Sequence, residues 1–251
     1  MSIKKFIHDN IGFIELIEVF GNDLTVVNAA RVSFNKESSF EEIKNETEKV
    51  INYKLPERDK KLINYLAKHN HITPFFHPQL RFRIKMPYFI MREWFRHTVG
   101  FSRNEVSRRY VDTPPEFFIP DRLRQRDPNL KQGSKPDPIP QDTQERERMQ
   151  EYFIRSREYN NYLLSIGVCP EQARIVLPQA MYNEFIETAS LYGYARLANL
   201  RLDSSAQKEI FYYAKIISEI IEPYFPVSWN ALVKKTSETA HQDSHIDMPS
   251  L

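Results

Sequence analysis

Residues 80–86 (LRFRIKM) alternate strictly between apolar and basic side chains, and this pattern constrains the fold more than any other segment of the chain. Successive side chains of a β-strand point to opposite faces of a sheet, so the alternation predicts a strand with one buried and one solvated face. Residues 11–21 are predicted to form a second strand, ended by the turn at residues 21–23, and residues 182–190 are compatible with a third. The core therefore contains a sheet.

Most of the remaining chain is predicted to be helical. A helix with Asp23 as its N-cap is expected over residues 24–34, and another begins at Pro87 and ends near Arg96. Further helices are expected at residues 57–70, 144–167, 170–177, 191–203 and 204–225, the last capped by Ser204 or Ser205. Because the strands are scattered between helices, the sequence predicts an α+β fold, a single helix-rich domain with a small mixed or antiparallel sheet.

Three segments lack the periodicity of either element. Residues 35–56 are charged and are expected to form a surface excursion. Residues 113–142 are rich in Pro, Asp, Arg and Gln, and are expected to be a surface loop or lid of the same domain, which spans residues 1–236. Residues 237–251 are polar and are expected to be a flexible tail.

The single cysteine, Cys169, excludes a disulfide framework within the chain and a four-cysteine zinc site. A buried, inert thiol is the expected state of this residue. The N-terminal segment makes a poor signal peptide, and no stretch approaches the roughly 20 apolar residues of a membrane span. We therefore expect a soluble, cytoplasmic protein without a membrane partner.

The segment 95–111 (FRHTVGFSRNEVSRRYV) concentrates four arginines and a histidine around one acidic residue, Glu105. Guanidinium groups offer planar, paired and permanently charged donors that suit phosphate oxygens. The net charge of only +2 means that any anion binding is local. An exposed basic loop is the simplest alternative. Nucleic-acid binding is disfavoured, because the charge is confined to one loop with no second basic run.

Two isolated arginines in apolar helical segments indicate an anion-binding pocket more specifically than the basic segment 95–111 does. Arg174 lies in ARIVLP and Arg201 in LANLRLD, where burial of an unpaired charge costs several kcal/mol. Each is therefore expected either to form a structural ion pair with Asp203, Glu171 or Glu209, or to line an anionic pocket with the 96–109 segment.

Other familiar sites are poorly supported. His69, His71 and His77 are spaced as H-x-H-x5-H in a turn, but no cysteine or HExxH pattern accompanies them, so we expect no metal. No GxGxxG or GxxxxGK[ST] loop is present, so a bound nucleotide is not held in a Rossmann or P-loop manner.

Five motifs together resemble one known family. Arg96-His97 followed by S-x-N-E-x-S-x-R-Y at residues 102–110 resembles the signature of the flavin-dependent thymidylate synthases. The other four follow that family's order and approximate spacing: HxTPFxH at 71–77, REWFRH at 92–97, ARIVLP at 173–178 and NLRxDSxAQxE at 199–209. The resemblance covers about residues 12–225.

The resemblance implies an activity and its partners. It implies the thymidylate synthase fold of that family and the methylation of dUMP at C5 to give dTMP. The one-carbon donor is 5,10-methylenetetrahydrofolate, and FAD reduced by NADPH supplies the hydride. It also implies a homotetramer whose active sites draw residues from several subunits, and no nucleic-acid partner.

The family's functional residues carry over to matching positions. Arg201 matches the catalytic arginine that stabilises negative charge at N3 and O4 of the uracil ring. The substrate-binding residues implied are Glu93, Arg96, Glu105, Ser107, Arg109, Arg174 and Arg201. The cofactor-binding residues implied are His71, Thr73, Arg96, His97, Thr98, Arg103, Glu105 and Arg196.

The chain departs from the family pattern mainly around the flavin. Thr98 stands where an arginine is usual, and we hypothesise that Arg103 folds back to supply the missing guanidinium to a flavin phosphate. Arg196 is a candidate to compensate for a second changed arginine position. The positions that differ are Phe76, Glu93, Thr98, Arg103, Ser190 and Tyr192. Glu93, in place of a glutamine, motivates one alternative, hydroxymethylation of a pyrimidine nucleotide; a non-catalytic nucleic-acid-binding protein is another.

Overall fold

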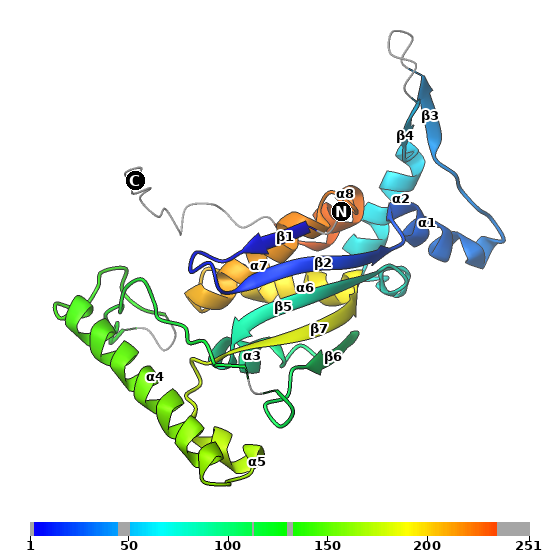
Figure 1. Cartoon of the computed structure of the whole chain (residues 1–251). Coiled ribbons are helices and arrows are strands. Elements are labelled where there is room, and N and C mark those ends of the chain that lie inside the picture. The colour runs from blue at the N-terminus through cyan, green and yellow to red at the C-terminus, as the bar shows by residue number, and fades with distance from the viewer. Residues whose placement is uncertain (1–2, 45–50, 112, 130–132, 235–251) are drawn as a thin grey trace.

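The computed structural model describes residues 3–44, 51–111, 113–129 and 133–234, and the expected tail at 237–251 lies outside them. Its centre is a five-stranded sheet in the order β1-β2-β5-β7-β6, in which every neighbouring pair is antiparallel (Figure 1). The strands are β1 (Ile3–Phe6), β2 (Phe13–Phe20), β5 (Gln79–Pro87), β6 (Phe101–Glu105) and β7 (Tyr182–Ser190). The predicted α+β fold with a small antiparallel sheet is confirmed.

The central strand β5 behaves as its alternation predicts. Leu80, Phe82, Ile84 and Met86 are at most 1% exposed, whereas the intervening basic side chains lie on the solvated face. Ile84 is paired with Phe185 of β7, so that side chains of the same phase in both strands face one core. The alternation of apolar and basic residues predicted this strand correctly because helices cover only one of its two faces.

Helices cover the buried face and one end of the sheet. α6 (Leu191–Arg201) and α7 (Lys208–Ile221) pack on each other, and α7 contacts β2 (Figure 1). α2 (Glu57–Lys68) packs on α8 (Pro226–Leu232) and on α1 (Asp23–Arg31). α3 (Tyr88–Trp94) follows β5 directly and buries Ile90, Met91 and Trp94. These helices and the sheet share one hydrophobic core.

Two predicted helix caps are wrong. Asn22, not Asp23, caps α1, because its side chain accepts hydrogen bonds from the amides of Leu24 and Thr25. Asp23 is buried and instead accepts from the amides of Val227 and Ser228 at the start of α8. Residues 204 and 205 do not cap the next helix, which begins at Lys208 with Gln207 as its N-cap.

The surface excursion at 35–56 contains an antiparallel hairpin of β3 (Glu41–Lys44) and β4 (Ile51–Lys54) that projects away from the sheet (Figure 1). The sequence prediction also missed β1 and β6. Both are edge strands with few buried side chains, so neither carries the apolar alternation of a central strand.

The second half of the chain adds an arm beside the sheet. α4 (Asp142–Ser165) extends along one side and ends near α5 (Pro170–Ala173) and the 3-10 turn Arg174–Val176 (Figure 1). The Ser156 hydroxyl of α4 donates to the Val176 carbonyl at 2.6 Å. Cys169 precedes α5 and is exposed, which corrects the expectation of a buried thiol. Among the described helices, none is both long and apolar enough to span a membrane.

Candidate active site

Arg201 is at the centre of a polar cluster where the ends of α3 and α6 meet. Its Nη1 is ion-paired with Oε1 of Glu93, and its Nε donates to Nε2 of His97 at 2.9 Å. The Arg201 side chain is 18% exposed. Arg201 therefore forms the structural ion pair that was one of its two expected roles. Its partner is Glu93, 108 positions earlier in the sequence, and not one of the three acidic residues expected.

His97 is a neutral acceptor in this cluster. The pKa of His97 is lowered to about 4, chiefly by burial and also by the positive charges of Arg201, Arg103 and Arg196. A neutral imidazole leaves Nε2 free to accept from Arg201. Together Glu93 and His97 therefore hold two of the three nitrogens of the Arg201 guanidinium in one orientation.

Arg103 is engaged within the protein. Its Nε is ion-paired with Glu187, which is fully buried, and its Nη1 donates to the His97 carbonyl at 2.6 Å. The guanidinium also lies 4.8 Å and 4.5 Å from the ring centroids of Phe95 and Phe101. Arg103 therefore holds the turn after α3 on the sheet. Its contact with a flavin phosphate stays a prediction, for which Nη2, without a hydrogen-bond partner among the described residues, is the remaining donor.

Sequence reasoning did not identify Glu187 as part of the site. Trp94 Nε1 also donates to this carboxylate, at 3.1 Å. A signal was available, because Glu187 is in phase with Phe185 and Ala189, which face the core from β7. A carboxylate at a core-facing position needs a buried cation, and that requirement points to an arginine on a neighbouring strand.

A second cluster lies at the other end of β6. Arg109 Nη1 is 3.4 Å from a carboxylate oxygen of Glu171, and Arg174 Nε donates to the Glu171 carbonyl at 3.3 Å. Glu105 ends β6, and its carboxylate accepts from Nδ2 of the Asn183 side chain at 3.1 Å. Arg109 and Arg174 are exposed, which corrects the expectation that Arg174 is buried.

No hydrogen bond or ion pair between described residues joins the first cluster to the second. His97 precedes β6 and Glu105 ends it, and a five-residue strand separates its ends by about 13 Å. Arg96 and Arg201 belong to the first side, whereas Ser107, Arg109 and Arg174 belong to the second. The sequence expectation that these arginines surround one nucleotide, in a chamber that neighbouring protomers can share, stays a prediction.

The turn at 98–100 lies beside Phe76 and Ser190, two of the positions that depart from the family pattern near the flavin. Phe76, at the end of the 3-10 turn Thr73–Phe76, lies 5.2 Å from Tyr192 between ring centroids. Gly100 has φ +78°, and a Cβ there would lie 2.8 Å from the Ser190 hydroxyl oxygen, so this position requires glycine. Five expected residues are exposed around this region: His71, Thr73, Arg96, Thr98 and Arg196.

The histidines of the turn at 69–77 were considered as metal ligands from their spacing. Within the described ranges, no group of three or more His, Cys, Asp or Glu side chains is arranged to hold a metal ion. His69 and His71 lie near Tyr65, with ring centroids 4.3 Å and 6.0 Å from the tyrosine ring, so the two histidines take part in aromatic packing.

Comparison with known sequences identifies a family model. The model described as "Thymidylate synthase complementing protein" matches residues 15–227. A flavin-dependent thymidylate synthase of Thermosipho africanus is 38% identical over 228 residues, covering 89% of this chain and 91% of that protein. One from Thermus thermophilus is 33% identical over 231 residues, covering 91% of this chain and 78% of that protein.

Comparison with solved structures agrees with the sequence relatives. The structure resembles a UMP/dUMP methylase, PolB from Streptomyces cacaoi, bound with 5-Br dUMP. The TM-score is 0.72 at 27% sequence identity, covering 87% of this chain and 93% of the other.

Proposed function

The chain belongs to the family of flavin-dependent thymidylate synthases, and from that premise we propose that it methylates dUMP at C5 to give dTMP. The observation that carries the assignment of roles is the orientation of Arg201 by Glu93 and His97. Family membership and the partial enclosure of Arg201 set aside a non-catalytic nucleic-acid-binding protein.

Arg201 is the residue to which we assign the catalytic role. C5 of uracil becomes nucleophilic when negative charge developing at N3 and O4 is stabilised, and a fixed guanidinium does so without losing a proton. Nη2 of Arg201 has no hydrogen-bond partner among the described residues, so this donor remains for the substrate. Orientation before binding lowers the reorganisation that the reaction requires.

The residues around the 98–100 turn fit an FAD cofactor. Arg96 and Arg196 supply exposed guanidinium groups suited to a diphosphate, and Gly100 keeps the turn free of a side chain that Ser190 would obstruct. Thr73, at the start of the 3-10 turn Thr73–Phe76, and His71, two residues before it, would contact the flavin. When bound, the flavin supplies the hydride that reduces the transferred carbon.

The remaining reactants follow from the redox balance. A methylene group carried to C5 must gain a hydride to become a methyl group, so the reaction needs a one-carbon donor and a reductant. We assign these roles to 5,10-methylenetetrahydrofolate and NADPH.

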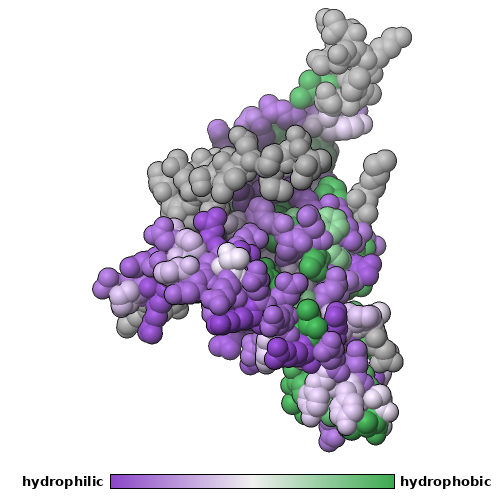
Figure 2. Space-filling view, turned by 60° about the vertical axis from the view of Figure 1, so that its left-hand side comes forward, coloured by the Kyte–Doolittle hydropathy of each residue, from purple (hydrophilic) through white to green (hydrophobic). Residues whose placement is uncertain are grey.

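Two subunits would complete the nucleotide site, within the homotetramer that we propose. The Arg201 cluster from one copy would face Glu105, Ser107, Arg109 and Arg174 from another. Ile175, beside Arg174, is 77% exposed. Apolar side chains are visible near the end of α4 and α5, at the bottom of Figure 2. Exposed apolar surface beside exposed arginines is typical of a face that a partner covers.

One assay tests the proposal and its nearest alternative. The FAD-loaded protein is incubated with dUMP and 5,10-methylenetetrahydrofolate, with and without NADPH, and the product is identified by mass. Formation of dTMP only with NADPH is expected. A hydroxymethylated nucleotide formed without reductant would favour the alternative reaction, and no product from dUMP or dCMP would overturn the proposal.

A further inference from the structure

The carboxyl group of Glu187 is a buried titratable group that the proposed reaction does not use. It lies on the core-facing side of β7 and is fully buried, and the side chain of its partner Arg103 is 11% exposed. Trp94 Nε1 lies 3.3 and 3.1 Å from its two oxygens. Glu187 therefore holds two segments at once, the end of α3 through Trp94 and β6 through Arg103.

Stability alone does not account for this ion pair. Among the described residues, two ion pairs have a fully buried carboxylate, Arg103–Glu187 and Arg31–Asp59. Replacing such a pair by apolar side chains of similar volume is often neutral or stabilising, because both charges lose their hydration on folding. Apolar side chains could thus fill the space between β6 and β7, but they would offer no hydrogen-bond donor.

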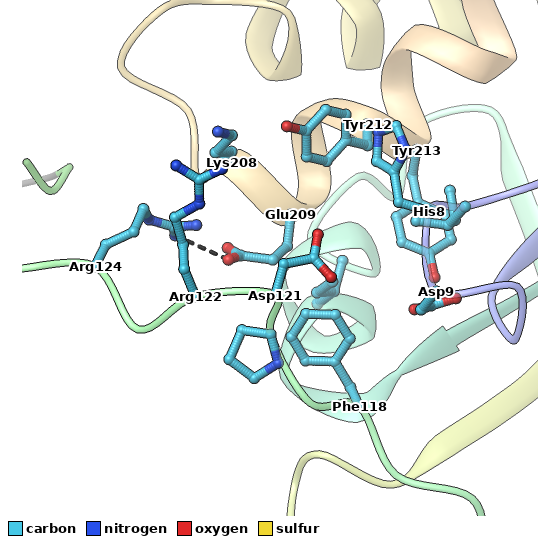
Figure 3. A pocket seen from close by; sticks show the side chains of 13 residues that line it. His8, Asp9, Phe118, Asp121, Arg122, Arg124, Lys208, Glu209, Tyr212 and Tyr213 are labelled. Atoms are coloured by element: carbon cyan, nitrogen blue, oxygen red, sulfur yellow. Dashed lines mark ion pairs between the residues drawn. The ribbon is translucent and has the colours of Figure 1, made fainter. Parts of the chain in front are cut away.

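A more exposed ion pair shows what burial adds. Arg124 and Glu209, joined by the dashed line in Figure 3, line a cavity at the start of α7 that is partly open to solvent. Water can hydrate either of these charges if the other moves away. Glu187 is closed to solvent, so Arg103 cannot leave it without stranding a buried carboxylate. The guanidinium of Arg103 is therefore held more firmly in place than that of Arg124.

The other end of the Arg103 guanidinium reaches the candidate active site. Its Nη1 donates to the His97 carbonyl at 2.6 Å, and the His97 amide donates to the Trp94 carbonyl at 3.1 Å. Both contacts come from residues that Glu187 anchors. The His97 imidazole in turn accepts from Nε of Arg201 at 2.9 Å. Three successive contacts therefore join the buried carboxylate to Arg201.

The second buried pair lacks this connection. Nε and Nη2 of Arg31 both donate to the same oxygen of Asp59, and no hydrogen bond joins the Arg31 side chain to another described residue. This pair links α1 to α2. The two pairs are thus alike in having a fully buried carboxylate, and they differ in whether the arginine also reaches the Arg201 cluster.

We propose that Glu187 and Arg103 are positioning residues of the reaction, which hold His97 where its imidazole orients Arg201. The inference rests on the proposed function, because that function gives Arg201 its catalytic role. A displacement of about 1 Å can cost on the order of 100-fold in rate. Since Arg201 stabilises charge that develops during the reaction, the loss should appear in kcat and not in KM.

The double variant Arg103→Met with Glu187→Leu separates positioning from stability. It leaves no buried charge unpaired and should fold, but the His97 carbonyl loses its donor. The kcat for dTMP formation should fall about tenfold, while the KM for dUMP stays within about twofold of wild type. FAD is kept saturating, so that a lost contact with the cofactor appears in its Kd instead. Arg31→Met with Asp59→Leu is the matched control and should keep the wild-type kcat.

NMR reports the position of His97 without relying on activity. The pKa of His97 is lowered to about 4, chiefly by burial, so its imidazole should stay neutral down to pH 5 in the wild-type and control proteins. In the Arg103 double variant His97 should become more exposed and begin to titrate above pH 5. The signal is assigned by its absence from His97→Gln. Because the double variant removes one positive and one negative charge, the net charge around the imidazole is unchanged.

The inference requires both the fall in kcat and the rise in the pKa of His97. Neither change, only one of them, or equal changes in the control would overturn it. If the double variant does not fold, Arg103→Lys replaces it, since lysine keeps a charge beside Glu187 but offers one nitrogen in place of two. If the wild-type protein makes no dTMP, the proposed function fails, and the NMR comparison still decides whether Glu187 and Arg103 hold His97.

Discussion

The guanidinium of Arg201 is ion-paired with the carboxylate of Glu93, and the two side chains are only 18% and 28% exposed. The pair joins the last turn of α6 to the end of α3 across 108 positions of sequence. The carboxylate fixes the arginine, but it also cancels part of the positive charge available to an anionic nucleotide. Glu93 therefore contributes both to the orientation of Arg201 and to the strength of its field.

Glu93→Gln should strengthen dUMP binding. The amide keeps the size and one acceptor of the carboxylate while removing its negative charge, so the Kd for dUMP should fall several-fold. Equilibrium titration of the FAD-loaded protein checks this. Glu158→Gln, on the exposed side of α4, is the matched control and should not change the Kd. Weaker binding by Glu93→Gln would mean that the carboxylate contacts the nucleotide favourably.

Arg103→Met should strongly destabilise the fold. The substitution leaves the buried carboxylate of Glu187 without its cation, which costs about 3–5 kcal/mol of unfolding free energy. Replacing both partners, in Arg103→Met with Glu187→Leu, should recover much of that loss, because no buried charge remains unpaired. Urea unfolding of the two variants measures the difference. Equal losses in both would show that the ion pair is not what makes Arg103 important.

Stability should fall as the pH falls from about 6.5 to about 4. The pKa of His97 is lowered from 6.5 to about 4 on folding, so the unfolded chain binds more protons than the folded protein between these values. The contribution is complete above pH 6.5 and is lost progressively below it. His97→Gln, which keeps an acceptor for Arg201, should show a shallower decline in urea unfolding at pH 7, 6 and 5. Parallel declines would assign the effect to other groups.

Gly100→Ala should weaken FAD binding and lower the unfolding free energy by about 1–2 kcal/mol. The backbone at this position has φ +78°, and the new Cβ would meet the Ser190 hydroxyl at 2.8 Å. Both effects distort the turn that carries Thr98. Flavin fluorescence titration measures the affinity, and Gly167→Ala, where φ is +91° with open space around the Cβ position, is the control for backbone strain alone. Equal effects of the two substitutions would show that the contact with Ser190 is unimportant.

The fold was predictable from sequence where one face of an element is buried. The alternation in β5 and the apolar side of α2 report burial directly, and both elements are where the sequence predicts them. Edge strand β6 was not predictable, because its sequence FSRNE buries little apolar surface and is held by backbone pairing with β7. The sequence predicted Asp23 as the N-cap of α1, but Asn22 is the cap. The Asp23 carboxylate instead accepts hydrogen bonds from the start of α8.

The sequence predicted which residues belong to the site, but it did not predict which of them form hydrogen bonds or ion pairs with each other. Motifs identified Arg201, His97 and Glu93, but nothing local indicates that the first donates to both of the others. The ion pair of Arg103 with Glu187 depends on the register of β6 against β7, in which these residues are directly opposite. Pairings of this kind arise from tertiary structure, so spacing along the sequence does not reveal them.

Complementation between two inactive variants tests most directly whether one nucleotide site is shared between subunits. Arg201→Ala and Arg174→Ala, carrying different affinity tags, are co-expressed and the mixed oligomers are purified through both tags. If each site combines Arg201 of one subunit with Arg174 of another, dTMP formation should return to about a quarter of the wild-type rate in randomly mixed oligomers. Mixed oligomers as inactive as either variant alone would contradict the shared site.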